Sequence, residues 1–352
     1  MDDTKQAVVG FTPFAPSEGT QVRREADAFW VRAPGAGEIR RCVLPEPGRN
    51  DVLVRTLHSG VSRGTEVIVF GGRVPASQYA AMRAPFQDGV FPGPVKYGYL
   101  NVGVVESGPA HLVGRTVFCL YPHQTRYVVP AEAVTLVPDE VPPARAVLAG
   151  TVETAVNALW DAAPLVGDRI SVVGAGMVGC CVARLLARFP AADVTLVDTD
   201  PDRAKIAHAL GVDFADPSAA PGDRDLVVHA SASESGLQLA LESLRPEGTV
   251  LDLSWYGDTP VSVHLGGPFH SRRLTIRSSQ VGLVSPSRRS SRTTGDRLAL
   301  ALELLRDDAF DAVLTGPTPF AELPQLMTQL VAGRLPGGCH VISYDGGLAC
   351  SA

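Results

Sequence analysis

The chain has 352 residues, of which 45% are hydrophobic and 19% are charged, and its formal net charge at pH 7 is −6. This length exceeds what one hydrophobic core usually serves, so two globular domains are expected and a disordered chain is excluded. The negative charge, without any run of five like charges, predicts no binding to nucleic acid or to a membrane surface.

The N-terminal segment predicts no targeting function. Residues 1–19 lack the basic stretch and apolar core of a secretory signal. No apolar run approaches the ~18 residues needed to span a membrane. We therefore expect a cytoplasmic protein whose first ~20 residues are a loosely ordered extension. The six cysteines are scattered, without a C-x-x-C pair, so no disulfide framework is expected.

Short β-like runs, separated by proline, glycine, asparagine and aspartate, fill residues 28–138. They read AFWVRA, EIRRCVL, DVLVRTL, VGVVESG, RTVFCLY, RYVVPA and VTLVP. This punctuation is typical of an all-β or barrel-like domain.

The pattern changes over residues 150–284, where strands alternate with helical stretches. Such alternation predicts βαβ units and a parallel sheet. A basic stretch follows, SRRSSR, which we interpret as a solvated loop because so short a run supports few phosphate contacts. The apolar spacing of DRLALALELLRDD then predicts an amphipathic helix, before a last helix and strand in ELPQLMTQLVAGRLPGGCHVISY.

The most specific motif is the glycine pattern in ISVVGAGMVG, which joins a buried strand to an apolar helix. Gly174 permits a tight turn, Gly176 lets a pyrophosphate approach the backbone, and Gly179 lets the helix pack closely on the sheet. The start of the helix, with Met177 and Val178, offers free N–H groups to the phosphates. The alternative is a tight turn that binds nothing.

A carboxylate follows where a dinucleotide site needs one. The strand DVTLVD ends in Asp198, 19 residues after Gly179 (198 minus 179), where it can accept hydrogen bonds from both ribose hydroxyls. Asp198 also repels a 2′-phosphate, and residues 199–201 supply no arginine to receive one. The sequence therefore favours NAD(H) over NADP. Arg203, further along, is interpreted as a surface helix residue.

Polar and aromatic residues end the later strands of the same region. Because ligands of open α/β sheets lie beyond the carboxyl ends of the strands, these residues are candidate walls for adenosine and nicotinamide. The alternative is that they are structural turn residues. They are Ser231, Trp255, Ser279 and Gln280.

This arrangement resembles the medium-chain dehydrogenase/reductase superfamily over nearly the whole chain after residue ~25. Within it, the chain is similar to the branch of 2-desacetyl-2-hydroxyethyl bacteriochlorophyllide dehydrogenase-like proteins. The matching segments are SGVSRGTE, VKYGYLNVGVV, FCLYPHQTRYVVPA, VETAVNALWD, SWYG and FHSRRLTIRSSQVG. The resemblance implies an α/β protein: a GroES-like β-barrel catalytic domain (1–149), a Rossmann doubly wound parallel-sheet domain (150–288) and a return segment (289–352) that completes the barrel domain. It also implies a homodimer paired through the edge strand LTIRSS.

The resemblance also locates the metal ligands of the zinc-dependent relatives, and this chain lacks them. Ser62 or Arg63 stands in place of the first cysteine, and Gly98-Tyr99-Leu100 replaces a G-H-E motif. The third ligand position falls near Ala149 and Gly150. The four-cysteine structural zinc lobe is also missing. A zinc site needs three or four N, S or O donors, so no zinc is predicted.

Without a metal, other groups must manage the proton and the developing charge on the substrate oxygen. Thr65 aligns with the hydroxyl residue that relays the proton in zinc relatives. We expect His123 or Tyr99 at the substrate oxygen, because a nearby lysine lowers the pKa of a phenol and a histidine titrates near neutrality. Lys96 would be the lysine that lowers the pKa of the phenol, and Glu153 would position the cofactor or the substrate. For each residue the alternative is packing or a satisfied hydrogen bond.

The predicted reaction is reversible hydride transfer between NAD(H) and a secondary alcohol or its ketone. The expected substrate is a small molecule, such as a sugar, an aminocyclitol or a polycyclic intermediate of specialised-metabolite biosynthesis. Two alternatives stay open: an NAD(P)H-dependent reductase of an enone or quinone, and a nucleotide-binding redox sensor without turnover. The polar groups of Tyr99 and His123 favour an alcohol–ketone oxidoreductase, because a flat apolar pocket would suit a reductase of enones or quinones better.

Overall fold

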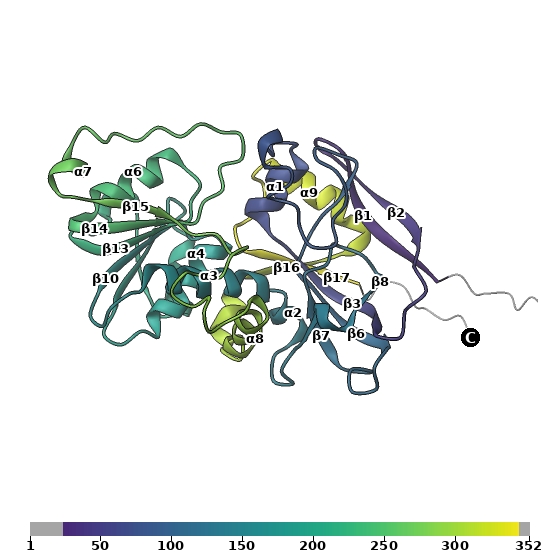
Figure 1. Ribbon diagram of the computed structural model, residues 1–352. Coiled ribbons are helices and arrows are strands. Elements are labelled where there is room, and N and C mark those ends of the chain that lie inside the picture. The colour runs from purple at the N-terminus through teal and green to yellow at the C-terminus, as the bar shows by residue number, and fades with distance from the viewer. Residues whose placement is uncertain (1–23, 345–352) are drawn as a thin grey trace, which may run out of the picture.

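The computed structural model describes residues 24–344. The predicted N-terminal extension and Cys350 lie outside the described residues. The chain folds into two lobes, one built on mainly antiparallel sheets and one on a parallel sheet, with helices between them (Figure 1). No helix in this part of the chain is long and apolar enough to cross a membrane.

The first lobe contains the β-like runs predicted from the sequence, and all seven form strands. A seven-stranded sheet has the order β16-β17-β3-β6-β7-β9, with β8 paired to β3, and a four-stranded sheet has the order β2-β1-β5-β4. The elements are β1 (Glu25–Ala33), β2 (Ala36–Val43), β3 (Asp51–Val61), α1 (Arg63–Phe70), β4 (Asp88–Gly89), β5 (Val95–Lys96), β6 (Asn101–Ser107), β7 (Thr116–Cys119), β8 (Arg126–Pro130), β9 (Val134–Leu136) and α2 (Pro143–Ala146).

The second lobe is a six-stranded parallel sheet with the order β12-β11-β10-β13-β14-β15. Strand order reverses between β10 and β13, and ligands of such sheets bind at this switch point. The elements are α3 (Ala149–Ala162), β10 (Arg169–Val173), α4 (Met177–Ala187), β11 (Asp193–Val197), α5 (Arg203–Leu210), β12 (Asp213–Ala215), β13 (Arg224–His229), α6 (Glu234–Glu242), β14 (Leu244–Asp252), α7 (Pro268–Ser271) and β15 (Thr275–Ser278).

The end of the chain serves both lobes. The predicted amphipathic helix is α8 (Thr294–Leu304), which packs on α3 beside the second lobe. The chain then returns to the first lobe with β16 (Leu314–Pro319), α9 (Leu323–Val331) and β17 (Cys339–Ser343). β17 pairs antiparallel with β3, so the last strands complete the first sheet.

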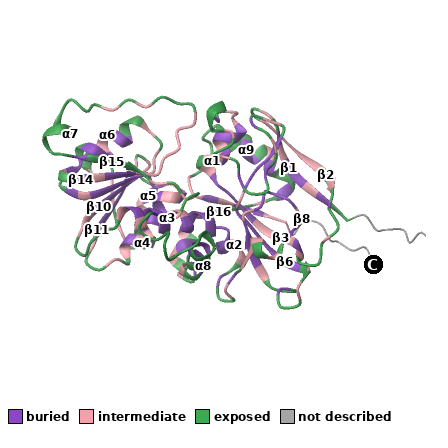
Figure 2. Cartoon of the chain, in the orientation of Figure 1, coloured by how far each residue is buried: buried purple, intermediate pink, exposed green. Residues whose placement is uncertain are grey.

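One core joins the two lobes. Most residues of β10, β13 and α3 are buried, and buried segments run through both lobes (Figure 2). The central strands are apolar on both faces because helices cover the sheet on both sides. The largest cluster of buried side chains runs from Leu100 and Phe118 of the first lobe through Val152 of α3 to Ile170 of the second. Because α3 packs within this shared core, it holds the two lobes in a fixed arrangement.

Candidate active site

The glycine turn after β10 has the geometry predicted for a dinucleotide site. Gly174 has a φ of +105°, and a Cβ there would lie 2.7 Å from the Ser231 nitrogen. A Cβ on Gly179 would lie 1.9 Å from the Gly174 oxygen, so only glycine lets α4 pack this closely on the turn. At Gly176 a Cβ would meet nothing within 4 Å. The side that Gly176 leaves open is the side from which a phosphate can approach.

The start of helix α4 offers donors to that open side. Gly176 precedes the helix, and no side chain caps its first turn. The first N–H groups of a helix have no partner within the helix, so they bind anions well. Met177 is buried and Val178 half-buried, so these two residues can contribute main-chain N–H groups rather than side chains. The turn therefore fits a diphosphate.

Asp198 follows β11 and is tied to the same turn. One carboxylate oxygen accepts a hydrogen bond from the Ala175 N–H at 2.7 Å, and the other accepts one from the Asp200 N–H at 2.9 Å. Each carboxylate oxygen has a second lone pair, so Asp198 can still accept a hydrogen bond from a ribose hydroxyl. Its charge is held beside the phosphate turn.

Arg203 is not the surface residue that we expected. It is 8% exposed, its guanidinium lies 3.1 Å from the Asp200 carboxylate, and it donates to the Gly337 carbonyl at 2.8 Å. Arg63 binds the same stretch of chain as Arg203, because it donates to the Leu335 carbonyl at 2.9 Å. Burial lowers the pKa of Arg63, and the charge of Arg203 lowers it further. The sequence did not predict that these two cations lie near each other.

Of the four residues predicted to line the cofactor pocket, Ser231 lies at the switch point and Trp255 packs against the first lobe. Ser231 lies two residues after the end of β13 and touches the Gly174 turn. Trp255 follows β14 and packs against a buried cluster of the first lobe that includes Ile68 of α1. In the same loop, a Cβ on Gly257 would lie 3.1 Å from Ile68. The loop after β14 therefore contacts the helix that carries Thr65.

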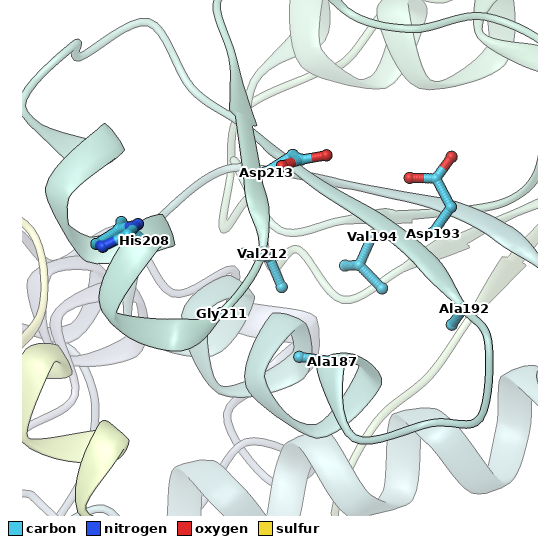
Figure 3. Close-up of a pocket in the computed structure, with 8 residues that line it drawn as sticks. All are labelled: Ala187, Ala192, Asp193, Val194, His208, Gly211, Val212 and Asp213. Atoms are coloured by element: carbon cyan, nitrogen blue, oxygen red, sulfur yellow. The ribbon is translucent and has the colours of Figure 1, made fainter.

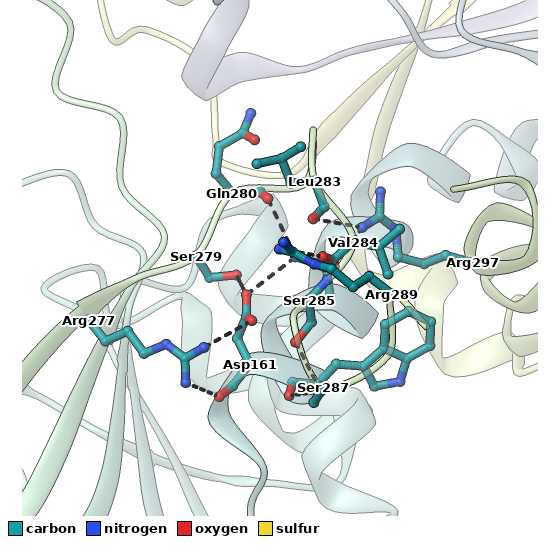
Figure 4. A network of polar contacts seen from close by, with 12 residues as sticks. Asp161, Arg277, Ser279, Gln280, Leu283, Val284, Ser285, Ser287, Arg289 and Arg297 are labelled. Carbon is teal, nitrogen blue, oxygen red and sulfur yellow. Dashed lines mark hydrogen bonds and ion pairs between the residues drawn. The ribbon is translucent and has the colours of Figure 1, made fainter. Parts of the chain in front are cut away.

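The other two wall residues belong to a polar network that fastens residues 277–297 to α3 (Figure 4). The Ser279 hydroxyl donates to Asp161 at 2.6 Å, and Arg277 donates to the main-chain carbonyl of Asp161 at 2.8 Å. Ser279 is therefore a structural residue, which was the alternative to its predicted place in the cofactor pocket. The Gln280 side chain extends away from the network in Figure 4, and its oxygen accepts the Gly282 N–H. Gln280 is exposed, so its amide N–H groups can reach a ligand.

Glu153 lies in the same network and does not face a substrate. Its carboxylate accepts hydrogen bonds from Arg297 at 3.0 and 2.9 Å, and both side chains are buried. Arg297 also donates to Asn157 at 2.6 Å and to the carbonyl of Leu283. The predicted positioning role of Glu153 is therefore corrected: with Arg297 it holds the segment after β15 against α3. No sequence pattern predicted this pair, because Glu153 and Arg297 lie 144 residues apart.

We expect Arg297→Met to destabilise the protein by about 3–5 kcal/mol, because it leaves the Glu153 carboxylate buried without its partner. Burial already raises the pKa of Glu153, although Arg297 lowers it. A folded-state pKa above the unfolded value means that stability falls as pH rises above about 4.5, so the variant should be weaker at pH 8 than at pH 5. Urea unfolding at both pH values measures this.

The matched control for that prediction is Arg277→Met, whose guanidinium is about half exposed and pairs with Asp161. Asp161 is buried, but its carboxylate keeps the hydrogen bond from the Ser279 hydroxyl, so this variant should lose less stability than Arg297→Met. The double variant with Glu153→Gln should recover part of the loss. Equal stability of the two single variants would contradict the prediction.

On the first lobe, three hydroxyl groups gather at the start of α1. Tyr99 donates its phenol proton to the Ser62 hydroxyl at 2.6 Å. Burial raises the pKa of Tyr99 to about 12, and hydrogen bonds with Ser62 and Thr65 oppose this rise. Tyr99 and Thr65 are half-buried. Tyr99 is thus a protonated phenol at neutral pH, and the hydroxyls of Ser62 and Thr65 lie next to it.

His123 lies behind this group. Its ring is 1% exposed, and both nitrogens have partners: Nε2 lies 2.9 Å from the Glu66 carboxylate and Nδ1 lies 2.6 Å from the Ser59 hydroxyl. Glu66 also accepts the Ser62 main-chain N–H at 2.8 Å. The prediction that His123 meets the substrate oxygen is corrected, because a buried ring with two partners cannot contact a ligand. His123 instead holds the Glu66 carboxylate in place, and that carboxylate binds the main-chain N–H of Ser62.

Lys96 also differs from the prediction. Its ammonium donates to the Gln124 side chain at 3.0 Å, lies 3.9 Å from Asp88 and sits over the ring of Tyr121. Burial lowers its pKa, and the charge of Asp88 opposes that change. These contacts, not Tyr99, hold the charge of Lys96, so its predicted support of the phenol is corrected.

The residues that stand at the zinc-ligand positions of the zinc-dependent relatives do not fit a zinc ion. Over residues 24–344, no group of three or more His, Cys, Asp or Glu side chains could hold a metal ion. His123 and Glu66 contact each other, and their remaining partners are a serine hydroxyl and a main-chain N–H. A zinc ion needs three or four N, S or O ligands arranged around one point.

A surface hollow lies at the opposite end of the parallel sheet (Figure 3). Its lining includes Asp193 and Asp213, the first residues of β11 and β12, together with His208 of α5. Ligands of open α/β sheets bind at the carboxyl ends of the strands, whereas this hollow lies at the amino ends. We therefore do not assign the cofactor to it.

Comparison with known protein families matches residues 170–250 to ketopantoate reductase PanE/ApbA. Among curated proteins, the chain is 25% identical to L-galactonate-5-dehydrogenase of Escherichia coli K12 over 318 residues, which cover 80% of this chain and 88% of that protein. It is 29% identical to L-threonine 3-dehydrogenase of Rhizobium rhizogenes over 203 residues, or 48% of this chain and 55% of that one.

Solved structures establish the fold. L-Idonate 5-dehydrogenase of Escherichia coli K-12 superimposes with a TM-score of 0.74 at 14% identity, covering 92% of this chain and 99% of that one. A protein described as a zinc-binding dehydrogenase from Sinorhizobium meliloti 1021, bound to NADP, gives 0.72 at 16% identity, covering 92% and 100%. An alcohol dehydrogenase of Escherichia coli CFT073 with NADH gives 0.71 at 16%, covering 91% and 99%. The chain has the GroES-like and Rossmann fold of the medium-chain dehydrogenases.

Proposed function

We propose that this chain, which has the fold of the medium-chain dehydrogenases, is an oxidoreductase that interconverts a secondary alcohol and a ketone with NAD(H) and without catalytic zinc. One observation carries the proposal: the loop after β14 of the nucleotide lobe contacts Ile68 of helix α1, the helix that begins after Ser62 and carries Thr65. This contact supports a proton donor on α1 that faces a dinucleotide bound at the carboxyl ends of the parallel strands.

The chemistry divides between the two lobes. Bound at the Gly174–Gly179 turn, NAD(H) would supply or accept the hydride. In ketone reduction, the Ser62 hydroxyl donates a proton to the carbonyl oxygen, and the Tyr99 phenol replaces that proton through their 2.6 Å hydrogen bond. Thr65 offers a second hydroxyl to the same oxygen. In alcohol oxidation the substrate proton would need an acceptor other than Tyr99, because that phenol is already protonated.

The choice of cofactor rests on the charge beside the phosphate turn. Asp198 is fixed there by two main-chain N–H groups, and a 2′-phosphate placed near it would be repelled. This supports NAD(H) over NADP in this chain. Arg203, the closest arginine along the chain, already pairs with Asp200 and with a main-chain carbonyl.

For the substrate, we propose a small polyhydroxy acid, sugar or aminocyclitol. The similarity to enzymes named for L-galactonate and L-threonine supports a secondary alcohol with polar neighbours. We assign the chain to the zinc-free branch similar to bacteriochlorophyllide dehydrogenase-like proteins, and expect a cytoplasmic homodimer. The edge strand β15 supports the dimer, because all four of its residues are exposed and it pairs only with β14 within the described sheet.

A spectrophotometric assay tests the proposal. Purified protein is incubated with NAD⁺ or NADP⁺ and a panel that includes L-galactonate, L-threonine and 2,3-butanediol, and formation of the reduced cofactor is followed. We expect turnover with NAD⁺ that survives dialysis against 1,10-phenanthroline. Loss of activity with the chelator and recovery with Zn²⁺ would refute zinc independence. Reduction of enones or quinones without any alcohol oxidation would favour the alternative reductase.

A further inference from the structure

A second buried histidine lies at the carboxyl end of the parallel sheet. His229 ends β13 and is 0% exposed. Its Nδ1 lies 2.9 Å from a carboxylate oxygen of Asp252, and its Nε2 lies 2.7 Å from the hydroxyl of Ser231. His229 and Asp252 are register partners on the parallel strands β13 and β14. The ring is therefore fixed between a hydroxyl and a carboxylate.

The charge distribution fixes the direction of these hydrogen bonds. Burial opposes ionisation of Asp252, but hydrogen bonds from His229, the Ser254 N–H and Tyr256 outweigh it, so the pKa of Asp252 is below its ordinary value. An ionised carboxylate only accepts, so Nδ1 of His229 carries the proton that it donates. Nε2 of the neutral ring is then the acceptor, and Ser231 donates its hydroxyl proton to it.

Ser231 lies between the buried histidine and the switch point of the sheet. Ser231 is half-buried and touches the Gly174 turn at the switch point of the sheet. A Cβ on Gly236, in the first turn of α6, would lie 2.2 Å from the Ser231 oxygen and 3.1 Å from Nε2 of His229. A glycine at this position is what lets the helix approach. Besides the histidine, Ser231 contacts Ser233 at 2.8 Å.

The ionisable groups and hydroxyls that contact this histidine come from few elements. The loop after β14 contributes Ser254 and Tyr256 at 3.2 and 3.3 Å from Nδ1, and β14 itself contributes Asp252. Burial raises the pKa of Tyr256, and the charge of Asp252 raises it further, so its phenol stays neutral. No Lys or Arg contact to His229 occurs among the described residues, so Asp252 is the charge that stabilises an imidazolium.

We propose that His229 and Asp252 activate the Ser231 hydroxyl as an acid–base group that receives the proton of a ribose hydroxyl in the nicotinamide half of the cofactor. The adenosine half belongs to the β10–β12 side of the switch point, where Asp198 lies, and β13 begins the other half. The proposal rests on the proposed function. In alcohol oxidation the ribose hydroxyl would pass its proton to the Ser231 oxygen and regain one from the substrate, so that no alkoxide remains. The Ser231 proton would pass to Nε2, and Asp252 would stabilise the imidazolium.

A hydroxyl bonded to a base that a third group orients reacts faster with electrophiles. This reactivity gives a test that needs no substrate. The native chain is treated with a fluorophosphonate and the modified residue is located by mass spectrometry. The Ser231 oxygen would attack phosphorus, fluoride would leave, and the Ser231 proton would pass to His229. We expect labelling of Ser231 that slows by about 100-fold in His229→Gln and Asp252→Asn.

Matched variants keep the test independent of folding. Ser231→Ala removes the labelled hydroxyl and keeps the His229–Asp252 pair, whereas Ser291→Ala removes an exposed hydroxyl that donates to the Arg288 carbonyl and should label like the native chain. NADH and nicotinamide mononucleotide should protect Ser231, and AMP should not. A merely structural His229 would leave the labelling rate of Ser231 at that of other exposed serines.

Direct titration of NADH binding, followed by fluorescence, separates the two proposals. Absence of NADH binding would overturn the proposed function. Normal NADH binding with no label on Ser231, or with a label that NADH does not block, would overturn the relay and leave the oxidoreductase assignment intact. Labelling that depends on His229 and is blocked by nicotinamide mononucleotide would support the relay.

Discussion

A Gly176→Val variant keeps the stability of the native chain and loses NADH binding, whereas Gly179→Val loses the fold. The two glycines lie three residues apart in one turn and meet different surroundings. Gly176 has φ −78° and ψ −173°, which valine adopts readily, and its Cβ would enter open space. Added methyl groups there fill the side from which the pyrophosphate approaches.

At Gly179 the added carbon meets backbone rather than open space. Its Cβ would lie 1.9 Å from the Gly174 oxygen and 3.4 Å from Val172, inside a buried core. Helix α4 would have to move off the turn, so we expect a loss of more than about 4 kcal/mol of unfolding free energy. For Gly176→Val we expect at least about 100-fold weaker NADH binding, which corresponds to about 2.7 kcal/mol.

Thermal unfolding and NADH titration of both variants measure the two effects separately. Gly222→Val is the control, since a Cβ there also meets nothing within 4 Å and the residue lies outside the turn. Native NADH affinity in Gly176→Val would place the phosphates elsewhere. An unfolded Gly176→Val would mean that the open space is needed by the chain itself.

The turn could be predicted because its signals are local. Gly174, Gly176 and Gly179 fall within six residues, and the apolar runs on either side define the strand and the helix. The strands of the first lobe were predicted for the same reason. Each run carries its own alternation and ends in turn residues, so neither the partner strand nor the rest of the fold has to be known.

The side-chain partners within the site could not be predicted in this way. Glu153 and Arg297 lie 144 residues apart, and His229 and Asp252 lie 23 apart on strands whose register decides that they meet. Lys96 and Tyr99 are close in sequence, yet the charge of Lys96 is held by Gln124 and Asp88. Pattern and spacing predict elements, whereas pairs of ionisable groups depend on tertiary packing.

The second large effect is expected at Tyr99. We expect Tyr99→Phe to lower kcat for ketone reduction by about 100- to 1000-fold, because it removes the group that replaces the proton of Ser62. NADH affinity should not change, since the phenol lies on the first lobe. Assay of the substrate identified with the panel above, with kcat and KM determined separately, measures this.

Tyr97→Phe is the matched control, because Tyr97 is the neighbouring buried tyrosine and its hydroxyl donates to the Met82 carbonyl instead, at 3.4 Å. This variant should keep nearly native kcat. Equal losses in Tyr97→Phe and Tyr99→Phe would indicate damaged packing and contradict the proton-donor role.

The pH dependence follows from the same geometry. Burial holds the pKa of Tyr99 at about 12, so the phenol keeps its proton from pH 6 to about pH 11. Ketone reduction should therefore show no loss from Tyr99 in that range, as the group is already in the form that donates. Alcohol oxidation needs the opposite transfer, to a phenol that is already protonated, and should depend on a further acceptor. A reduction rate that falls with an apparent pKa near 10 in the native chain, and not in Tyr99→Phe, would show that the phenol is not held in its protonated form.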